Sequence, residues 1–189
     1  MIDSPEHLLY LERFEGAEVP IPSRWLGARG QEGPVYQLRR GDHVLWTVGV
    51  DFGYASSFPF REQRVWAAAG VVVIGGGEVV YVLDAATGEL RHEISVEGYF
   101  GHFKLARVAA PAGGEEELLF VLGCRDVHAI DARLATRWVA RDVAIDGIVF
   151  VELRDNAVIV SAEMDPPGGW VDVALDVVTG ALLRREDPG

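Results

Sequence analysis

Residues 71–91 read VVVIGGGEVVYVLDAATGELR, and this stretch decides the fold. It contains an apolar run, a glycine turn, a second apolar run ending in Leu83-Asp84, a short turn ending in Thr87-Gly88, and the start of a third run. Short runs of Val, Ile, Leu and aromatic residues that are bounded by Gly, Asp, Asn and Pro are typical of β-strands. The stretch therefore predicts strands joined by tight turns.

The same pattern recurs along the chain at a nearly constant spacing. Ile130-Asp131 and Leu175-Asp176 occupy the place of Leu83-Asp84, and Leu38-Arg39 fits it less closely. The apolar residue of each pair falls at 38, 83, 130 and 175, with steps of 45, 47 and 45 residues. A fixed period of this kind is the signature of a repeat architecture. Four repeats fill the chain, at approximately 5–50, 51–96, 97–143 and 144–187.

Each repeat divides into four short strands. The expected strands are 62–68, 71–75, 79–83 and 89–95 in the second repeat, and 7–13, 20–26, 34–38 and 43–49 in the less regular first repeat. The second strand is apolar almost throughout, which predicts protein on both of its faces, whereas the fourth alternates and predicts one solvated face. This gradient indicates strands ordered from the inside of each repeat to its outside. No long window sustains a helical period, so an all-β fold is expected.

Two turns carry a resemblance to a known family: Leu83-Asp84-Ala85-Ala86-Thr87-Gly88 and Leu175-Asp176-Val177-Val178-Thr179-Gly180. They resemble the outer hairpin of quinoprotein-like (PQQ-like, WD40-related) β-propeller blades, and the resemblance covers roughly residues 34–187. It implies a small β-propeller of four four-stranded blades in a single domain, residues 1–189. The alternative is a half-propeller that a homodimer completes. We favour the monomer, because unpaired blade edges promote aggregation.

The resemblance does not extend to an activity, because propellers host many unrelated functions. The quinone-dependent dehydrogenases of the family are secreted, eight-bladed and calcium-dependent, and they bear tryptophan docking motifs. This chain has half as many repeats, so we do not expect that activity or its cofactor.

Charge and composition narrow the classes of partner. The chain has 29 acidic and 17 basic residues and a formal net charge of -12. Nucleic-acid binding needs clustered Lys and Arg, so it is not expected, whereas a basic protein partner would be attracted. No apolar run approaches the roughly 20 residues of a membrane-spanning helix, so no membrane is expected. The acidic start of the chain is unlike a signal peptide, and a lone Cys124 suits a reducing compartment, which together predict a cytoplasmic protein.

Catalytic and metal-binding signatures are missing from the sequence. There is no Gly-x-x-x-x-Gly-Lys loop, since the only Lys is Lys104, and the five His residues are not at zinc-ligand spacing. Arg125 follows Cys124, but a buried free thiol is the simpler interpretation. We therefore expect a protein that is not an enzyme and that holds no metal or cofactor.

The loops between repeats suggest a partner-binding face. Two of them carry an acidic residue followed by aromatic residues, and a long Pro-Gly-rich loop follows Glu163. In propellers such loops share one face. Aromatic side chains dominate interface energetics, and carboxylates favour a basic partner. The competing interpretation is that the aromatic residues pack between blades. The predicted face consists of Asp51, Phe52, Tyr54, Glu97, Tyr99, Phe100, His102, Asp126, Asp146, Glu163, Asp165 and Trp170.

The sequence thus favours a non-catalytic protein-interaction module. A sharper hypothesis is a bacterial immunity or antitoxin-type protein that neutralises a basic partner, because such proteins are small and acidic. Two alternatives remain at this point. One is a ligand- or sugar-binding propeller, or a hydrolase, that uses acidic residues such as Glu97 and Asp146 at the central channel. The other is an eight-bladed dimer whose function lies where the two chains pair.

Overall fold

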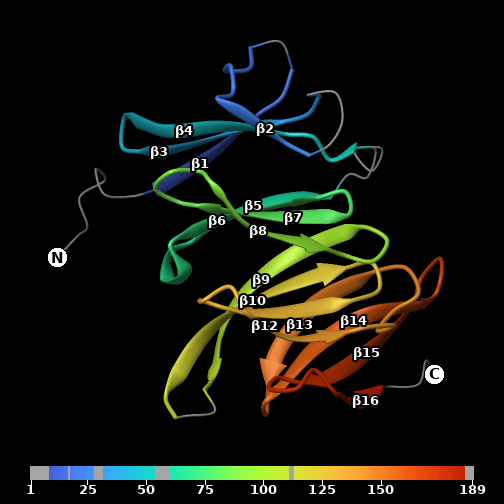
Figure 1. The fold of residues 1–189 in the computed structure, drawn as a ribbon. Helices are drawn as coiled ribbons and strands as arrows, with labels where there is room; N and C mark the ends of the chain where they lie inside the picture. The colour runs from blue at the N-terminus through green and yellow to red at the C-terminus, as the bar shows by residue number, and fades with distance from the viewer. Residues whose placement is uncertain (1–8, 17, 28–31, 54–59, 111–112, 186–189) are drawn as a thin grey trace. The chain divides into compact units, whose positions relative to one another are not determined.

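The computed structural model describes residues 9–16, 18–27, 32–53, 60–110 and 113–185. The chain divides into two compact units, Met1–Ile94 and Ser95–Gly189, and each is described by itself below. Together they contain four four-stranded sheets, which confirms the predicted all-β fold (Figure 1). Helix within the described residues is limited to the 3-10 turn η3 (Ala67–Ala69). None of these residues belongs to a helix with the length and apolarity that crossing a membrane requires. The single domain remains a prediction.

The second sheet belongs to the N-terminal unit and follows the expected order. Its strands are β5 (Arg61–Trp66), β6 (Val71–Gly76), β7 (Val79–Asp84) and β8 (Leu90–Ser95), and they neighbour one another in sequence order. Every residue of β6 is buried, while β8 is mostly exposed. The apolar strand therefore lies inside the unit, with protein on both faces, as its composition requires.

The C-terminal unit holds two sheets that share one core. The third sheet consists of β9 (Phe100–Ala109), β10 (Glu115–Gly123), β11 (Val127–Asp131) and β12 (Thr136–Ala140). The fourth consists of β13 (Ile148–Arg154), β14 (Ala157–Asp165), β15 (Gly169–Asp176) and β16 (Leu182–Arg185). Phe120 of β10 and Val160 of β14 lie in the same buried cluster. Alternate residues of facing strands thus form the core of this unit.

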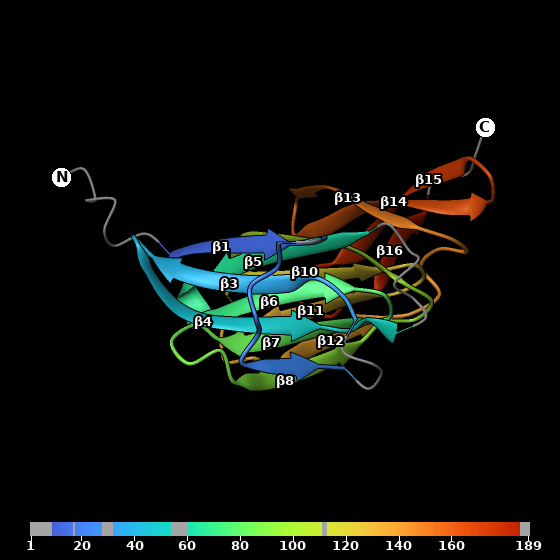
Figure 2. The same cartoon turned by 90° about the horizontal axis from the view of Figure 1, so that it is seen from above.

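The first sheet departs from the expected order. Its strands are β1 (Leu9–Phe14), β2 (Arg24–Leu26), β3 (Val35–Arg40) and β4 (His43–Val50), arranged as β1-β3-β4-β2. Figure 2 shows β1, β3 and β4 side by side in this order. β2 pairs in parallel with β4 at the outer edge, so residues 20–26 do not supply the second strand from the inside, and that expectation was wrong. Gly49 explains the position of β2, because a Cβ there would lie 2.5 Å from the Trp25 ring. The glycine leaves the space into which Trp25 packs.

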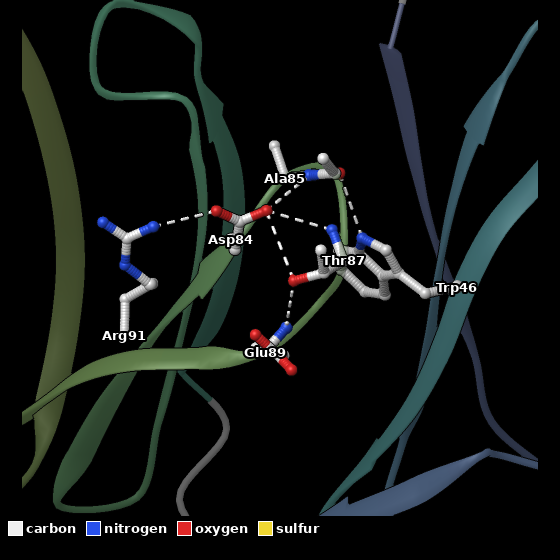
Figure 3. A network of polar contacts seen from close by, with 7 residues as sticks. Trp46, Asp84, Ala85, Thr87, Glu89 and Arg91 are labelled. Carbon is white, nitrogen blue, oxygen red and sulfur yellow. Dashed lines mark hydrogen bonds and ion pairs between the residues drawn. The ribbon is translucent and has the colours of Figure 1, made fainter.

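The recurring Leu-Asp…Thr-Gly sequence forms a turn that is organised around the carboxylate (Figure 3). Asp84 Oδ1 accepts hydrogen bonds from the backbone N–H groups of Ala86 at 2.9 Å and Thr87 at 3.0 Å, and Arg91 Nη1 donates to Oδ2 at 2.9 Å. Asp176 accepts the corresponding bonds from Val178 and Thr179. Asp side chains favour turns because they satisfy the backbone donors that a strand has left unpaired.

A tryptophan from the neighbouring sheet lies on each of these two turns. Trp46 Nε1 of β4 donates to Ala85 O at 3.1 Å, as Figure 3 shows, and Trp138 Nε1 of β12 donates to Val177 O at 2.9 Å. A Cβ at Gly88 would lie 2.7 Å from the Trp46 ring, and one at Gly180 would lie 2.5 Å from the Trp138 ring. The glycine of the motif therefore provides the surface on which the indole rests.

This contact was not expected from the sequence, in which tryptophan docking was considered only as a property of the dehydrogenases. The signal was nevertheless present. Trp138 follows Trp46 by 92 residues, and Gly180 follows Gly88 by the same 92 residues. Each unit of the chain thus contains one copy of the same tryptophan-on-turn contact.

Candidate partner-binding site

Four loop segments of the C-terminal unit meet at one end of its two sheets. They are residues 96–99, 123–126, 142–147 and 163–170, strand ends included, which we call the acidic loop end. Backbone hydrogen bonds join them in series: Cys124 N donates to Tyr99 O at 2.7 Å, Gly147 N donates to Cys124 O at 2.9 Å, and Glu163 N donates to Gly147 O at 2.9 Å. These main-chain contacts hold the side chains of the four segments close together.

Tyr99, Glu163 and Trp170 converge on Gly147, which has a φ of 142°. A Cβ at Gly147 would lie 3.2 Å from Trp170 Cη2, 3.6 Å from Tyr99 Oη and 3.7 Å from Glu163 Oε2. Glu163 and Trp170 are also directly opposite in the ladder of β14 and β15, so they share one face of the sheet. Tyr99 Oη donates to the backbone oxygen of Asp146 at 3.1 Å. Four of the predicted residues therefore lie together.

Part of this group is accessible to a partner. Trp170 exposes 43% of its surface and Ile145 exposes 52%. Asp146 and Asp165 are exposed, and Glu163 is half-buried. Ile145 was not in the sequence prediction, although an apolar residue between acidic loop residues was a visible signal. The acidic loop end thus presents apolar surface bordered by carboxylates.

Cys124 lies beneath this surface and is buried. Its thiol donates to Asp146 Oδ1 at 3.4 Å. Burial, together with the hydrogen bond to the Asp146 carboxylate and its negative charge, raises the pKa of the Cys124 thiol to about 11. The thiolate, not the thiol, is the reactive form, so Cys124 is unreactive near neutral pH. Burial likewise raises the pKa of the neighbouring Tyr99.

Arginines neutralise part of the charge at one edge of the acidic loop end. Arg125 contacts Glu97 at 3.0 Å and Asp142 at 2.6 Å, and Arg141 approaches Glu97 at 4.0 Å. Such partly exposed pairs contribute little to stability, but they order the loops that carry them. Glu97 is therefore held within the protein's own ion pairs.

Asp126 was predicted on the binding face, and the structure places it inside the unit with 1% of its surface exposed. Its Oδ2 accepts the backbone N–H of Glu97 at 3.1 Å and lies 2.7 Å from His128 Nε2. Oδ1 has no hydrogen-bond partner among the described residues. The hydrogen bond between Glu97 N–H and Asp126 thus connects the loop at residue 97 to the residue that precedes β11.

Phe100 and His102 of β9 also make contacts inside the C-terminal unit. Phe100 is fully buried, and its ring centroid lies 4.6 Å from that of Phe103. His102 Nε2 accepts the backbone N–H of Phe150 at 3.1 Å and so connects β9 to β13. In this position the Nε2 atom has no proton, because it accepts a hydrogen bond.

The remaining predicted residues belong to the N-terminal unit. Asp51 is buried and its Oδ1 accepts the backbone N–H of Gly53 at 2.8 Å. Phe52 is buried against Gly76, where a Cβ would lie 2.8 Å from the ring. Tyr54 lies outside the described residues. Asp51 and Phe52 therefore pack within their own unit.

Among the described residues, no three His, Cys, Asp or Glu side chains are grouped so that they could hold a metal ion. Comparison of the chain with protein-family models and with curated proteins gives no match.

Proposed function

We propose that the acidic loop end binds a basic protein and that this protein is a non-catalytic interaction module. The observation that carries the proposal is the exposed Trp170 ring with the Glu163 carboxylate beside it and the exposed Asp146 on the adjoining loop. A Lys or Arg side chain of a partner that lies over an indole face gains about 0.5–2 kcal/mol, and adjacent carboxylates add a charge-assisted hydrogen bond. Exposed Ile145 and Trp170 supply the apolar centre that interface hot spots need.

The net charge supports the same partner. A chain with a formal charge of -12 attracts a basic protein over distances beyond contact, and this attraction raises the rate of association. The role that we propose is that of an immunity or antitoxin-type protein, in which the acidic loop end covers a functional basic surface of a toxin.

We propose further that the four sheets are the blades of a small quinoprotein-like propeller. Support comes from the carboxylate-centred turns and from the tryptophans that rest on them, which give neighbouring sheets a fixed contact at their outer strands. The acidic loop end then corresponds to the rim that the sequence predicts. Propellers carry their binding surfaces on such loops.

The test is affinity capture with the full chain as bait, followed by purification of the captured protein and measurement of its affinity. We expect a stoichiometric complex with a basic protein, and its Kd should rise steeply between about 50 mM and about 300 mM salt. Trp170→Ala combined with Glu163→Gln should weaken binding about 30-fold or more, since truncating a hot spot costs about 2 kcal/mol or more.

The matched control is Tyr10→Ala combined with Glu78→Gln. It removes one exposed aromatic and one exposed carboxylate from the N-terminal unit. This variant should bind as the wild type does. An affinity that does not respond to salt, or an equal loss in the two double variants, would contradict the proposal.

A further inference from the structure

A polar cleft of about 620 Å³ lies within the N-terminal unit, between β1 and β5. Residues 10–13 of β1 line one wall and residues 61–64 of β5 line the other. Each of these strands is the first in the order of its own sheet, so a sheet edge borders the cleft on either side. Both walls carry arginines and glutamates: Glu12 and Arg13 stand on one, and Arg61, Glu62 and Arg64 on the other.

A buried hydroxyl group lies beside this cleft. Tyr36 of β3 is directly opposite Arg13 of β1, so the two side chains lie on the same face of the first sheet. None of the Tyr36 surface is exposed, and Arg13, which can only donate, is close to its Oη, so the hydroxyl proton has no acceptor among the described residues. A buried donor without an acceptor costs about 1–3 kcal/mol, which makes a ligand at this point favourable. Burial raises the pKa of Tyr36 to about 12, with the charges of Arg13 and Arg61 acting in the opposite direction. The hydroxyl keeps its proton and is a donor.

A carboxylate of the protein already lies between the two arginines. Glu15 Oε1 is 2.9 Å from Arg61 Nη1 and 3.7 Å from Arg13 Nε. The second distance is too long for a hydrogen bond, so Arg13 is only partly neutralised by this carboxylate. The Arg61 guanidinium is also 5.8 Å from the centroid of the buried Phe52 ring, which restricts its orientation. Glu15 itself is about half exposed and can move aside.

We propose that this cleft binds an oxyanion, a carboxylate or phosphate group, in the place that the Glu15 carboxylate now occupies. Arg13 and Arg61 donate charge-assisted hydrogen bonds to it, and Tyr36 Oη donates a third bond. Guanidinium groups fit planar carboxylates and phosphates because their N–H donors are fixed in a fork. This site is in the N-terminal unit and is independent of the acidic loop end, so it adds a second ligand class to the proposed function.

The first measurement is the melting temperature of the full chain in inorganic phosphate, up to about 20 mM, against chloride at the same ionic strength. A ligand that binds only the folded state raises the melting temperature. Wild type should be stabilised, and Glu15→Gln should be stabilised at lower phosphate concentration, because the internal competitor is gone. Arg13→Gln should weaken phosphate binding about tenfold or more, the loss of a charge-assisted hydrogen bond.

The control is Arg64→Gln, which makes the same charge change on the same cleft. Arg64 is paired with Glu62 at 2.7 Å, and its side chain is 58% exposed. It should respond to phosphate as wild type does. Tyr36→Phe separates binding from folding, because it removes a buried hydroxyl whose proton has no acceptor. The stabilisation by phosphate should become smaller, whereas the melting temperature without phosphate should stay equal or rise.

Two sources could supply the oxyanion, and a short polyglutamate peptide distinguishes them. Binding of the peptide at a lower concentration than phosphate points to an acidic segment of a protein, and stabilisation by phosphate alone points to a free anion. Absence of any phosphate effect in both wild type and Glu15→Gln would overturn the proposal. Equal weakening in Arg13→Gln and Arg64→Gln would overturn it as well, because general charge would then explain the effect.

Discussion

At the scale of the residue, the absence of a side chain decides how two sheets meet. Gly88 and Gly180 have φ angles of 69° and 71°, a region that L-residues with a Cβ avoid. Each also lies under a tryptophan ring, at a distance where a Cβ would have to displace the indole. One residue type therefore satisfies both a backbone requirement and a packing requirement, and no other residue type can do so.

We expect Gly88→Ala and Gly180→Ala to lower the free energy of unfolding by about 2 kcal/mol or more each. Positive φ costs about 1–2 kcal/mol, and displacing the tryptophan adds an overpacking cost. Gly70→Ala is the control, because Gly70 has a φ of 65° and a Cβ there would meet nothing within 4 Å. It should lose about 1 kcal/mol in urea denaturation. An equal loss in all three variants would show that the tryptophan contact contributes nothing.

The predicted site residues fall into two groups: some stay near the surface, and others pack into the core of their unit. Asp146, Glu163 and Trp170 lie close together where the segments that join neighbouring strands meet. Phe100 and Phe52 follow acids in the same way, yet they pack inward. In each case an aromatic residue follows an acidic one, and this local pattern does not show whether the ring packs inward or stays exposed, because that depends on what lies across from it.

At the scale of the element, the aspartate turns hold the outer hairpins of three sheets. Hydrogen bonds from Thr87 and Ala86 lower the pKa of Asp84, and those from Thr179 and Val178 lower the pKa of Asp176. Burial acts to raise the pKa of Asp131, but the bonds from Ala135, Arg137 and Arg133 outweigh it and leave this pKa lowered. All three carboxylates are therefore stabilised in the ionised form.

These shifts predict a loss of stability in acid. Because each folded pKa lies below the ordinary Asp value of 3.8, the carboxylates stabilise the fold above that value, and the stabilisation disappears as the pH falls through the lowered pKa. Urea denaturation at about pH 7 and about pH 3 should show this decrease.

Asp131→Asn should reduce the dependence of stability on pH, because it removes one of the three titrating groups. The control is Asp165→Asn, on the exposed hairpin turn between β14 and β15. It should keep the wild-type dependence. If Asp131→Asn and wild type lose the same free energy on acidification, the turn carboxylate is not the titrating group.

The positions of the strands were predictable, because they depend on the local sequence pattern. The order of strands in the first sheet was not predictable, because it depends on a contact between residues far apart in the sequence. β3 and β4 form a hairpin whose turn is visible in the sequence around Gly41. The parallel pairing of β2 with β4 instead depends on Trp25 fitting over Gly49, 24 residues away. Nothing in the sequence of residues 20–26 alone distinguishes an inner strand from an outer one.

At the scale of the whole molecule, each compact unit contains two sheets and one tryptophan-on-turn contact. The formal charge of -12 makes self-association unfavourable at low salt, because like-charged molecules repel. The proposed closure of four blades within one chain likewise leaves no need for a second copy.

We therefore expect light scattering to give a mass near 20.6 kDa at low and at high salt. Low salt alone is not a sufficient test, since electrostatic repulsion then opposes any dimer, and high salt removes that repulsion. A dimer that persists at both salt concentrations would contradict the closed monomer and favour the eight-bladed alternative.

The 92-residue spacing of the two tryptophans has a consequence for the ancestry of the protein. Because each indole needs the turn of the following sheet, the smallest piece that keeps its own contact is a pair of sheets. Gene duplication or loss in whole pairs of sheets preserves every such contact. Gain of a single sheet instead leaves one indole without a turn to pack on. Homologous chains should accordingly differ in length by multiples of about two sheets, and a chain with an odd number of them should have lost a tryptophan.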